Sequence, residues 1–283
     1  MHHRPPRLLA RALVACAPVV GLLLAFGPSA GASTVGGSPS AAAVAAARRA
    51  LEHLAIGPPT DHRLPGHIRH LRGLTQVQSS NWSGYADTGS GFSAVTGHWT
   101  EPAATCGTRN TLAAFWVGID GYSSTSVEQD GTLMQCFQGT ATYYSWWEMY
   151  PSNAIQVVGG SVRPGDSITA SVVRSGTRYT LKLTDATHTG NSFSTTQSCS
   201  CANSSAEWIA EAPSNGASIV PPTDFHTWTL GSATAKTTSK SGVINTFPDN
   251  EITMVDTSGR TEVQPGPLNG TGNGFTCTWK RNN

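Results

Sequence analysis

Two stretches of the chain that are typical of β-strands each carry one polar side chain suited to water chemistry. Residues 127–132 contain Gln129, and residues 205–211 contain Glu207. A glutamate can take a proton from water, and a neutral carboxamide can donate a hydrogen bond to an oxygen that becomes negative during acyl transfer. Taken singly, each is more often an ordinary solvated side chain. Together they could hydrolyse a peptide bond without a metal ion or a covalent intermediate.

Three further segments carry tryptophans, glycines and acidic residues at short spacing. In chain order, the five segments are residues 81–84 (Asn-Trp-Ser-Gly), 116–121 (Trp-Val-Gly-Ile-Asp-Gly), 127–132 (Val-Glu-Gln-Asp-Gly-Thr), 146–151 (Trp-Trp-Glu-Met-Tyr-Pro) and 205–211 (Ser-Ala-Glu-Trp-Ile-Ala-Glu). As an ordered set they resemble the motifs of the glutamic peptidases, or eqolisins. The resemblance covers roughly residues 78 to 230, and the set is far more specific than any single member.

The resemblance implies a role for each matching residue. It makes Glu207 the general base, and later the acid that protonates the leaving amine. It makes Gln129 the group that positions the water and stabilises the oxyanion. The residues that it places in the substrate groove and in the network around the pair are Trp82, Gly84, Trp116, Asp120, Trp146, Glu148 and Tyr150. It implies a polypeptide substrate, no cofactor and no metal ion.

The residues themselves leave some of these roles open. Glu207 and Glu211 lie four apart, so on a regular strand they share one face and either could be the base. The Ala-Glu-Trp motif of the family favours Glu207. Asp120, in a Gly-Ile-Asp-Gly turn, could equally cap the backbone, and some of the tryptophans could simply be core residues. Glu128, adjacent to Gln129, should point to the opposite face and have a structural role.

An amide beside the glutamate has a physical advantage over a second acid. Two close carboxylates raise one another's pKa, whereas an amide N–H donated to a carboxylate favours the ionised form. Gln129 is therefore expected to help Glu207 stay ionised below about 4.3, the pKa of a free glutamate. Hydrolysis is accordingly expected at acidic pH.

Two positions depart from the family pattern. Fungal members often carry an aspartate four residues after the catalytic glutamine, where this chain has Leu133. Asp130 lies nearer to Gln129 and could substitute for that aspartate. The connection from Asp120 to Gln129 is also one residue shorter than in the family. Both differences leave open which groups support the reacting pair.

The composition and the residue alternation predict an all-β fold. Charged residues make up 12% of the chain, about half the usual share, and long helical patterns are rare after residue 60. Residues 168–172 and 179–183 alternate apolar and polar side chains on either side of a turn, which predicts a hairpin with one buried face. Further strands are predicted at residues 91–100, 111–119, 155–158, 225–230 and 252–255. Many short strands predict a sandwich of two antiparallel sheets, and the resemblance specifies a concanavalin A-like (lectin-like) sandwich with a concave substrate groove.

The first 75 residues differ in composition from the rest. Arg4, Arg7 and Arg11 precede an apolar stretch that ends in a small-residue cleavage site, which predicts a signal peptide at residues 1–32. An uncleaved membrane anchor is the weaker alternative. Residues 33–75 are expected to be a partly helical or disordered propeptide or linker, followed by a catalytic domain at residues 76–283. The protein is thus expected to be secreted, monomeric and free of the membrane after signal removal.

Charge is divided unevenly across this boundary. Residues 1–75 hold 8 of the 18 Lys and Arg and 2 of the 17 Asp and Glu, which leaves residues 76–283 with 10 basic and 15 acidic groups, or −5. The hypothesis that follows is a basic leader held on an acidic domain by charge and released when the carboxylates are protonated. A disordered linker is the alternative.

The cysteine count suits a secreted protein. Loss of Cys16 with the signal peptide leaves an odd number of cysteines, at positions Cys106, Cys136, Cys199, Cys201 and Cys277. Two disulfides and one free thiol are the simplest count, and the sequence does not give the pairing. A metal site at Cys199 and Cys201 would need further ligands, and the histidines after residue 75 show no ligand spacing.

Other functions have weaker support. Gly165-Asp166-Ser167 resembles a serine-protease nucleophile motif but predicts a turn before a strand, and the His-Glu-x-x-His zinc motif is absent from the sequence. A carbohydrate-active protein is the stronger alternative, because lectin-like sandwiches with paired glutamates and tryptophans also bind or hydrolyse polysaccharides. Glu148 and Glu207 would then be the pair, but a glycosidase has no special use for Gln129. No nucleic-acid partner is expected.

Overall fold

The computed structural model describes residues 69–71, 74–158, 162–215 and 218–282. The expected signal peptide and most of the expected propeptide or linker lie outside the described residues. The chain divides into two units, Met1–Ser38 and Pro39–Asn283, and every described residue belongs to the second unit. Within this described part, no helix has the length and apolar character needed to cross a lipid bilayer.

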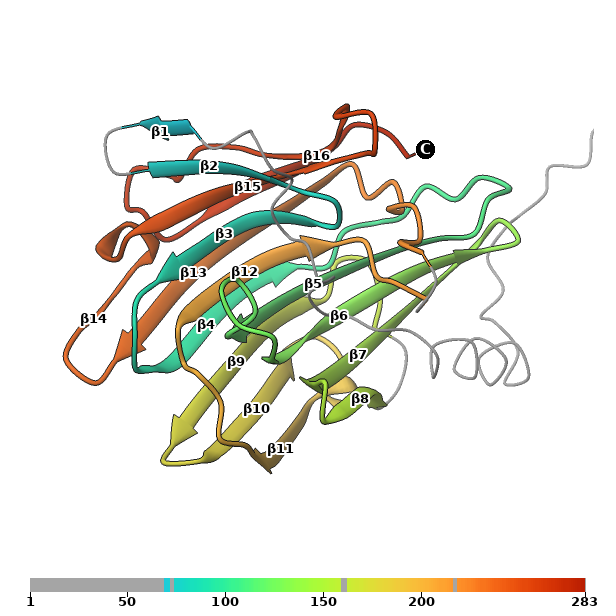
Figure 1. The fold of residues 1–283 in the computed structure, drawn as a ribbon. Coiled ribbons are helices and arrows are strands. Elements are labelled where there is room, and N and C mark those ends of the chain that lie inside the picture. Colours follow the sequence, from blue (N-terminus) through green and yellow to red (C-terminus); the bar gives the residue numbers. More distant parts are fainter. Residues whose placement is uncertain (1–68, 72–73, 159–161, 216–217, 283) are drawn as a thin grey trace, which may run out of the picture. The chain divides into compact units, whose positions relative to one another are not determined.

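The described residues form two packed layers of strands (Figure 1). The first layer runs from edge to edge through β1 (Arg69–Leu71), β2 (Leu74–Ser79), β15 (Asp249–Val255), β3 (Trp82–Thr88), β12 (Ser205–Glu211), β5 (Thr111–Ile119), β6 (Val127–Phe137), β7 (Thr140–Tyr150) and β8 (Asn153–Val158). The second runs through β16 (Thr261–Pro265), β17 (Phe275–Trp279), β13 (Thr227–Thr237), β4 (Phe92–Thr100), β9 (Ser167–Ser175), β10 (Arg178–Asp185) and β11 (Phe193–Ser198).

Short elements complete the two layers. A two-residue strand, β14 (Ser241–Gly242), pairs with β13, and two 3-10 turns are η1 (Thr189–Asn191) and η2 (Ile244–Thr246). Hydrogen bonding is continuous between the layers, because β15 pairs with β3 of one layer and with β16 of the other. Among the described strands, only the β2–β15 pairing is parallel. The predicted all-β sandwich of antiparallel sheets is confirmed.

The two faces of the first layer are both covered, which explains its residue pattern. Every residue of β5 and of β12 is buried, whereas β10 alternates buried and accessible residues along its length. One apolar cluster fills the space between the layers and includes Phe115, Val117 and Trp208. A second cluster lies on the other face of the first layer and includes Trp116 and Trp146. Strands buried on both faces have near-continuous apolar runs, as these do.

Most of the predicted strands are confirmed, with shifts at their ends. The predicted hairpin is the β9–β10 pair, in which Arg178 lies opposite Ser175. The strand predicted at residues 225–230 is instead β13, Thr227–Thr237. It continues because Ala233 and Ala235 extend the buried alternation past a register irregularity that follows Gly231. Because the alternation is broken locally, the sequence pattern did not predict the second half of this strand.

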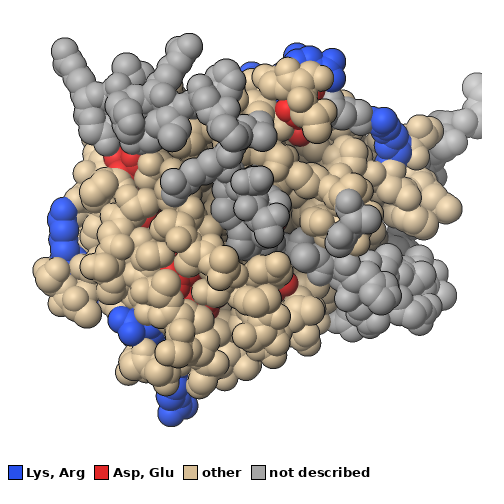
Figure 2. All heavy atoms as spheres, viewed as in Figure 1, with Lys and Arg blue, Asp and Glu red and all other residues tan. Residues whose placement is uncertain are grey.

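The carboxylates of this part of the chain are mostly internal. Of the 15 Asp and Glu in residues 76–283, 13 are buried, and Asp224 and Asp249 are half-buried. Nine of the ten Lys and Arg in the same range are exposed, and Arg174 is half-buried. On the part of the surface that Figure 2 draws in colour, Lys and Arg side chains project outward and little Asp or Glu is visible. Attraction of a basic leader to an acidic exterior therefore loses its physical basis, while the boundaries at residues 32 and 75 stay predictions.

The described residues contain two disulfides and one free thiol, which confirms the count predicted for the cysteines after residue 75. Cys106 pairs with Cys136, Cys199 pairs with Cys201, and Cys277 is a buried thiol. The first bond ties the segment before β5 to the end of β6. The second lies in the segment that leads into β12.

Candidate active site

Glu207, Gln129 and Glu148 lie in one row across the first layer. The antiparallel register sets Glu207 of β12 opposite Gly118 of β5. The same Gly118 lies opposite Gln129 of β6, and Gln129 lies opposite Glu148 of β7. Residues directly opposite one another in a sheet point to the same face. Three motifs that are far apart in sequence are therefore brought together on one face.

Gly118 lies between Glu207 and Gln129 and has no side chain of its own. Neighbouring strands are about 4.8 Å apart, so the backbones of these two residues are separated by about 10 Å. A Cβ atom on Gly118 would lie 2.9 Å from Cζ3 of Trp116 and 3.3 Å from Cβ of Gln129. The glycine therefore makes room for the Trp116 ring, which packs against the backbone in the middle of the row. Gly118 was not among the predicted site residues, although a glycine inside an apolar strand often marks a close approach.

The carboxamide of Gln129 is oriented by Glu148. Its Nε2 donates a hydrogen bond to Oε2 of Glu148 at 3.0 Å, and both side chains are buried. Oε1 of Glu207 accepts a long bond of 3.4 Å from the Tyr122 amide, and Oε2 of Glu207 accepts no hydrogen bond within the described part of the chain. Gln129 and Glu207 thus share a face without bonding to each other directly.

Burial raises the pKa of Glu207 well above its usual value. Removal from water is the largest cause, and the nearby Asp120 and Glu128 add to it, while the Ser205 hydroxyl and the Tyr122 amide act in the opposite direction. The expectation that Gln129 would lower this pKa is wrong for this structure. The amide donates to Glu148 instead, and desolvation of the charged form outweighs the hydrogen bonds that favour it.

Asp120 binds the segment that precedes β12. Its carboxylate accepts the backbone N–H groups of Asn203 and Ser204, each at 2.7 Å, and the Ser204 hydroxyl at 2.9 Å. This geometry is the backbone-capping alternative, and it fixes the start of the strand that carries Glu207. Glu128 points away from Gln129, as predicted, and burial together with Asp120 raises the pKa of Glu128 to about 9.

Three tryptophans of the motifs form the apolar part of the same face. Trp82, Trp116 and Trp146 are fully buried members of the second cluster, and Tyr150 packs against it while half-buried. The rings of Trp82 and Trp116 meet edge to face, with their centroids 5.0 Å apart. Gly84 serves strand packing, because a Cβ atom there would lie 2.1 Å from the carbonyl oxygen of Trp208.

Glu211 shares the face of Glu207 but is held differently. One of its oxygens accepts a bond from Nδ2 of Asn81 at 3.2 Å, and the other accepts the Nε1–H of Trp116 at 2.9 Å. Both oxygens of Glu211 therefore serve as acceptors that fix neighbouring side chains. Oε2 of Glu207 is not used in this way, which favours Glu207 as the group that handles water.

Asp130 does not replace the aspartate that the family pattern expects. Leu133 lies on the Gln129 face, within the second cluster. Asp130 lies one residue after Gln129 and points between the layers, where burial raises the pKa of its carboxyl. The support for Gln129 comes from Glu148 instead.

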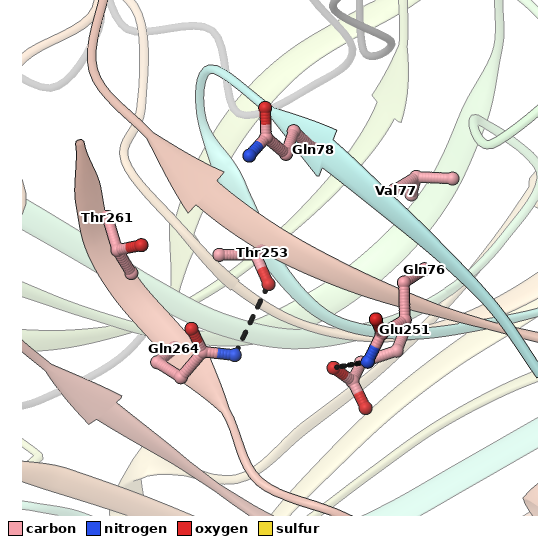
Figure 3. Close-up of a pocket in the computed structure, with 7 residues that line it drawn as sticks. All are labelled: Gln76, Val77, Gln78, Glu251, Thr253, Thr261 and Gln264. Atoms are coloured by element: carbon pink, nitrogen blue, oxygen red, sulfur yellow. Dashed lines mark hydrogen bonds between the residues drawn. The ribbon is translucent and has the colours of Figure 1, made fainter. Parts of the chain in front are cut away.

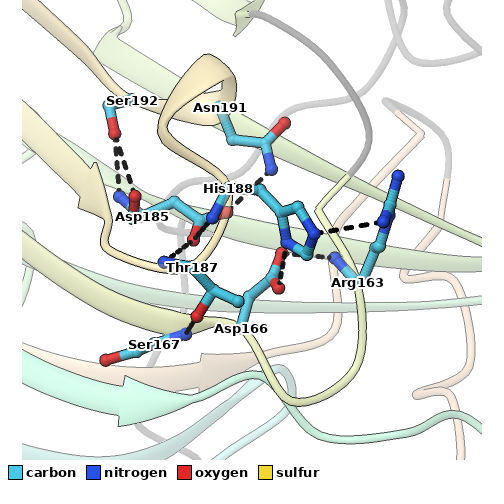
Figure 4. A network of polar contacts seen from close by, with 8 residues as sticks. All are labelled: Arg163, Asp166, Ser167, Asp185, Thr187, His188, Asn191 and Ser192. Atoms are coloured by element: carbon cyan, nitrogen blue, oxygen red, sulfur yellow. Dashed lines mark hydrogen bonds and ion pairs between the residues drawn. The ribbon is translucent and has the colours of Figure 1, made fainter.

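An acid–histidine pair lies outside this row, at the ends of β9 and β10 (Figure 4). Nδ1 of His188 is 2.6 Å from Oδ1 of Asp166, and Nε2 of His188 is 3.1 Å from Nη1 of Arg163. Asp185 accepts the backbone N–H groups of Thr187 and His188. The nitrogen that would activate a serine faces an arginine, so the network fastens a turn and does not form a hydrolytic triad.

A polar pocket lies at the other end of the first layer (Figure 3). Its lining residues are Gln76, Val77, Gln78, Glu251, Thr253, Thr261 and Gln264. Their polar groups are partly used within the protein, since Gln76 and Tyr85 donate to Glu251 and Gln264 donates to Thr253. None of the residues singled out by the motifs lines this pocket.

Comparison with known proteins gives the family. Residues 80–271 match the family model described as the peptidase A4 family. The chain belongs to this family. Aspergillopepsin-2 of Aspergillus niger is 30% identical to this A4 peptidase over 200 residues, which cover 61% of this chain and 71% of that protein. Scytalidopepsin B of Scytalidium lignicola is 32% identical over 149 residues, or 51% of this chain and 56% of that protein.

Solved structures agree with this membership. Scytalido-glutamic peptidase with a transition state analog inhibitor aligns with a TM-score of 0.61 and 26% identity, over 71% of this chain and 98% of that one. Aspergilloglutamic peptidase from Aspergillus niger aligns with a TM-score of 0.52 and 25% identity, over 60% of this chain and 99% of that one. This member of the A4 family is a glutamic-type endopeptidase that hydrolyses polypeptides.

Proposed function

We propose that Glu207 and Gln129 cleave the peptide bond by activating a water molecule directly. The supporting observation is the cross-strand row in which both side chains lie on one face, separated by Gly118. Glu207 takes a proton from the water, which attacks the carbonyl carbon. Gln129 donates a hydrogen bond to the oxygen that becomes negative. Glu207 then passes its proton to the leaving amine, which breaks the C–N bond.

In this proposal Glu148 is a positioning residue. Its hydrogen bond to Nε2 of Gln129 holds the carboxamide in one orientation, so that the amide does not need to reorganise as the oxyanion forms. The apolar cluster beside the row, with Trp82, Trp116 and Trp146, excludes water from the surroundings of the pair. Charged and polar interactions are stronger in such a site than in water.

The raised pKa of Glu207 affects the proposed pH range. A general base must be ionised, so kcat/KM is expected to rise with pH through the pKa of Glu207 in the free enzyme. Because burial raises that pKa, the acid limb should lie above about 4.3, the value for a free glutamate. Weakly acidic conditions are therefore favoured over strongly acidic ones.

Glycoside hydrolysis by Glu148 and Glu207 fits the row poorly. The two residues are three strands apart, which separates their backbones by about 14 Å. Gln129 stands between them and is bonded to Glu148. Gln129 thus occupies the position between the two carboxyl groups, where a glycosidase holds the scissile bond.

A substrate comparison tests the proposed reaction. The secreted protein is incubated with denatured casein and, separately, with β-glucan at about pH 3 to 6, on both sides of the pKa of a free glutamate. New amino termini from casein and no reducing sugar from β-glucan are expected. Release of sugar without peptide cleavage would reverse the assignment.

Adding a methyl group at Gly118 should impair the row without unfolding the protein. In Gly118→Ala the new Cβ crowds Gln129 and Trp116, and a displacement of a reacting group by about 1 Å can cost about a hundredfold in rate. We expect kcat/KM to fall by about ten- to a hundredfold, measured on a peptide substrate. Gly190→Ala is the matched control, because a Cβ at Gly190 meets nothing within 4 Å. Full activity of Gly118→Ala would contradict the need for a glycine between the pair.

Secretion and a propeptide at residues 33–75 remain part of this proposal. Their support is the composition of the first 75 residues, with its basic start, apolar stretch and Ala-Gly-Ala cleavage site. Sequencing the N-terminus of the protein recovered from culture medium tests both points. A mature start near residue 76 is expected, and a mature start at Ser33 would remove the propeptide.

A further inference from the structure

The outer face of the second layer carries cations and hydroxyl groups without carboxylates. It is formed by the outward side chains of β13, β4, β9, β10 and β11, which alternate with buried ones. Arg178, Lys182 and Lys236 are all exposed on it, and most of its other positions are Ser or Thr. We call this surface the cationic face. None of its strand positions is Asp or Glu, because the acids of these strands and their ends point inward.

The register gives the cationic face its dimensions. Arg178 and Lys182 lie four residues apart on β10, or about 13 Å along the strand. Lys236 is in register with Ala94, Val173 and Thr180, so it lies three strands, or about 14 Å, from β10. Between these cations lie hydroxyl groups such as Thr180, whose Oγ1 is 3.2 Å from that of Thr196. Val173, 49% exposed, is the apolar centre of the triangle.

The charge of this face limits what can cover it. A second copy of the chain, docked face to face by a two-fold axis, would place cations against cations. The leader does not fit either, because residues 1–75 hold 8 basic and 2 acidic groups. No Asp or Glu occupies an outward position of its strands, so no carboxylate on this surface pairs with these cations. Its occupant is therefore anionic and comes from outside the chain.

The chemistry of the face selects among anionic polymers. The outward positions of its strands offer no Phe, Tyr or Trp side chain on which nucleic-acid bases could stack. Val173 is its only exposed large apolar residue, which is too little apolar surface for insertion into a lipid layer. Closely spaced hydroxyl groups suit a hydroxyl-rich chain, and the three cations suit carboxylates spaced along it.

We propose that the cationic face binds an acidic polysaccharide, a polymer of sugars that carry carboxylate groups. Binding there occupies the outer side of the second layer, whereas the row of Glu207, Gly118 and Gln129 lies on the outer side of the first layer. The peptidase would thus be held on acidic polysaccharide while it cleaves protein nearby. The inference does not depend on the catalytic roles proposed above.

Binding to polygalacturonate tests this proposal. The full chain is titrated with soluble polygalacturonate at about pH 5, where uronic acid groups are ionised, in about 20 mM and about 200 mM salt. Saturable binding that weakens at the higher salt concentration is expected. The variant Arg178→Gln/Lys182→Gln/Lys236→Gln should lose at least about tenfold in affinity at low salt, because it removes three charges from the contact. Its cleavage of a soluble peptide should stay unchanged.

A charge-matched variant and two other polymers make the result decisive. Arg109→Gln/Lys280→Gln/Arg281→Gln removes three exposed cations that lie outside the strands of the cationic face, and it should keep its affinity. An equal loss in this variant would overturn the proposal, because the attraction would then be non-specific. Equal binding to neutral dextran would overturn the role of charge. Tighter binding to single-stranded DNA than to polygalacturonate would overturn the proposal and show that the face binds nucleic acid.

Discussion

Glu207→Gln is expected to reduce kcat by about a thousandfold or more on a peptide substrate. Glutamine has nearly the shape of glutamate but does not accept a proton from water, and general base catalysis contributes about a hundred- to ten-thousandfold. Gln129→Ala removes the proposed oxyanion donor, for which losses of about a hundred- to a thousandfold are typical. KM should change little in either variant, because the lost interactions are made mainly in the transition state.

Glu211→Gln is the matched control for Glu207→Gln. The two glutamates lie on the same strand and the same face, and both are fully or almost fully buried. Although the bond from Nδ2 of Asn81 is lost, the amide oxygen of the glutamine can still accept the Trp116 N–H, so activity should fall by less than about tenfold. If Glu211→Gln is inactive while Glu207→Gln is active, the roles of the two residues are exchanged. Thermal unfolding of all variants separates loss of chemistry from loss of fold.

The free energy of unfolding is expected to fall as pH rises from weakly acidic to alkaline values. Burial raises the pKa of Asp87 to about 9, of Glu101 to about 8 and of Glu128 to about 9. The folded state therefore holds three protons that the unfolded chain releases above about pH 4. Stability is largest below the unfolded pKa values and is lost as pH rises toward the folded values.

The size of this effect should be large. Each unit of pKa difference corresponds to about 1.4 kcal/mol, and native domains have only about 5 to 15 kcal/mol of net stability. We expect Tm to fall by more than about 10 °C between about pH 4 and pH 8, measured by circular dichroism. A Tm that rises over this range would contradict the assignment of buried neutral acids.

A pair of variants identifies the groups responsible. Glu101→Gln/Glu128→Gln removes two of the buried acids, so Tm should depend less steeply on pH. Asp224→Asn changes a half-buried carboxyl, and Tm of this variant should depend on pH as steeply as Tm of the unaltered protein. Equal slopes in all three proteins would show that other groups control the pH dependence.

Local residue order was enough to assign the strand faces and to identify the ordered set of motifs. An alternation with period two decides which side chains share a face. It therefore predicted that Glu128 and Gln129 point to different faces, and that Glu207 and Glu211 share one face. It also predicted the hairpin of β9 and β10, since its two alternations and its turn are local. The five motifs were sufficient to predict the A4 family, because their order along the chain needs no tertiary information.

Contacts between strands determine how the residues of these motifs lie relative to one another. The register of β12, β5, β6 and β7 places Gly118 between Glu207 and Gln129. It also brings Gln129 next to Glu148, to which its amide donates a hydrogen bond. Folding also turned Asp120 toward the segment before β12. It buried the acids, which raised the pKa of Glu207 and left a basic exterior. Register and burial depend on contacts between residues far apart in sequence, and local residue patterns do not contain them.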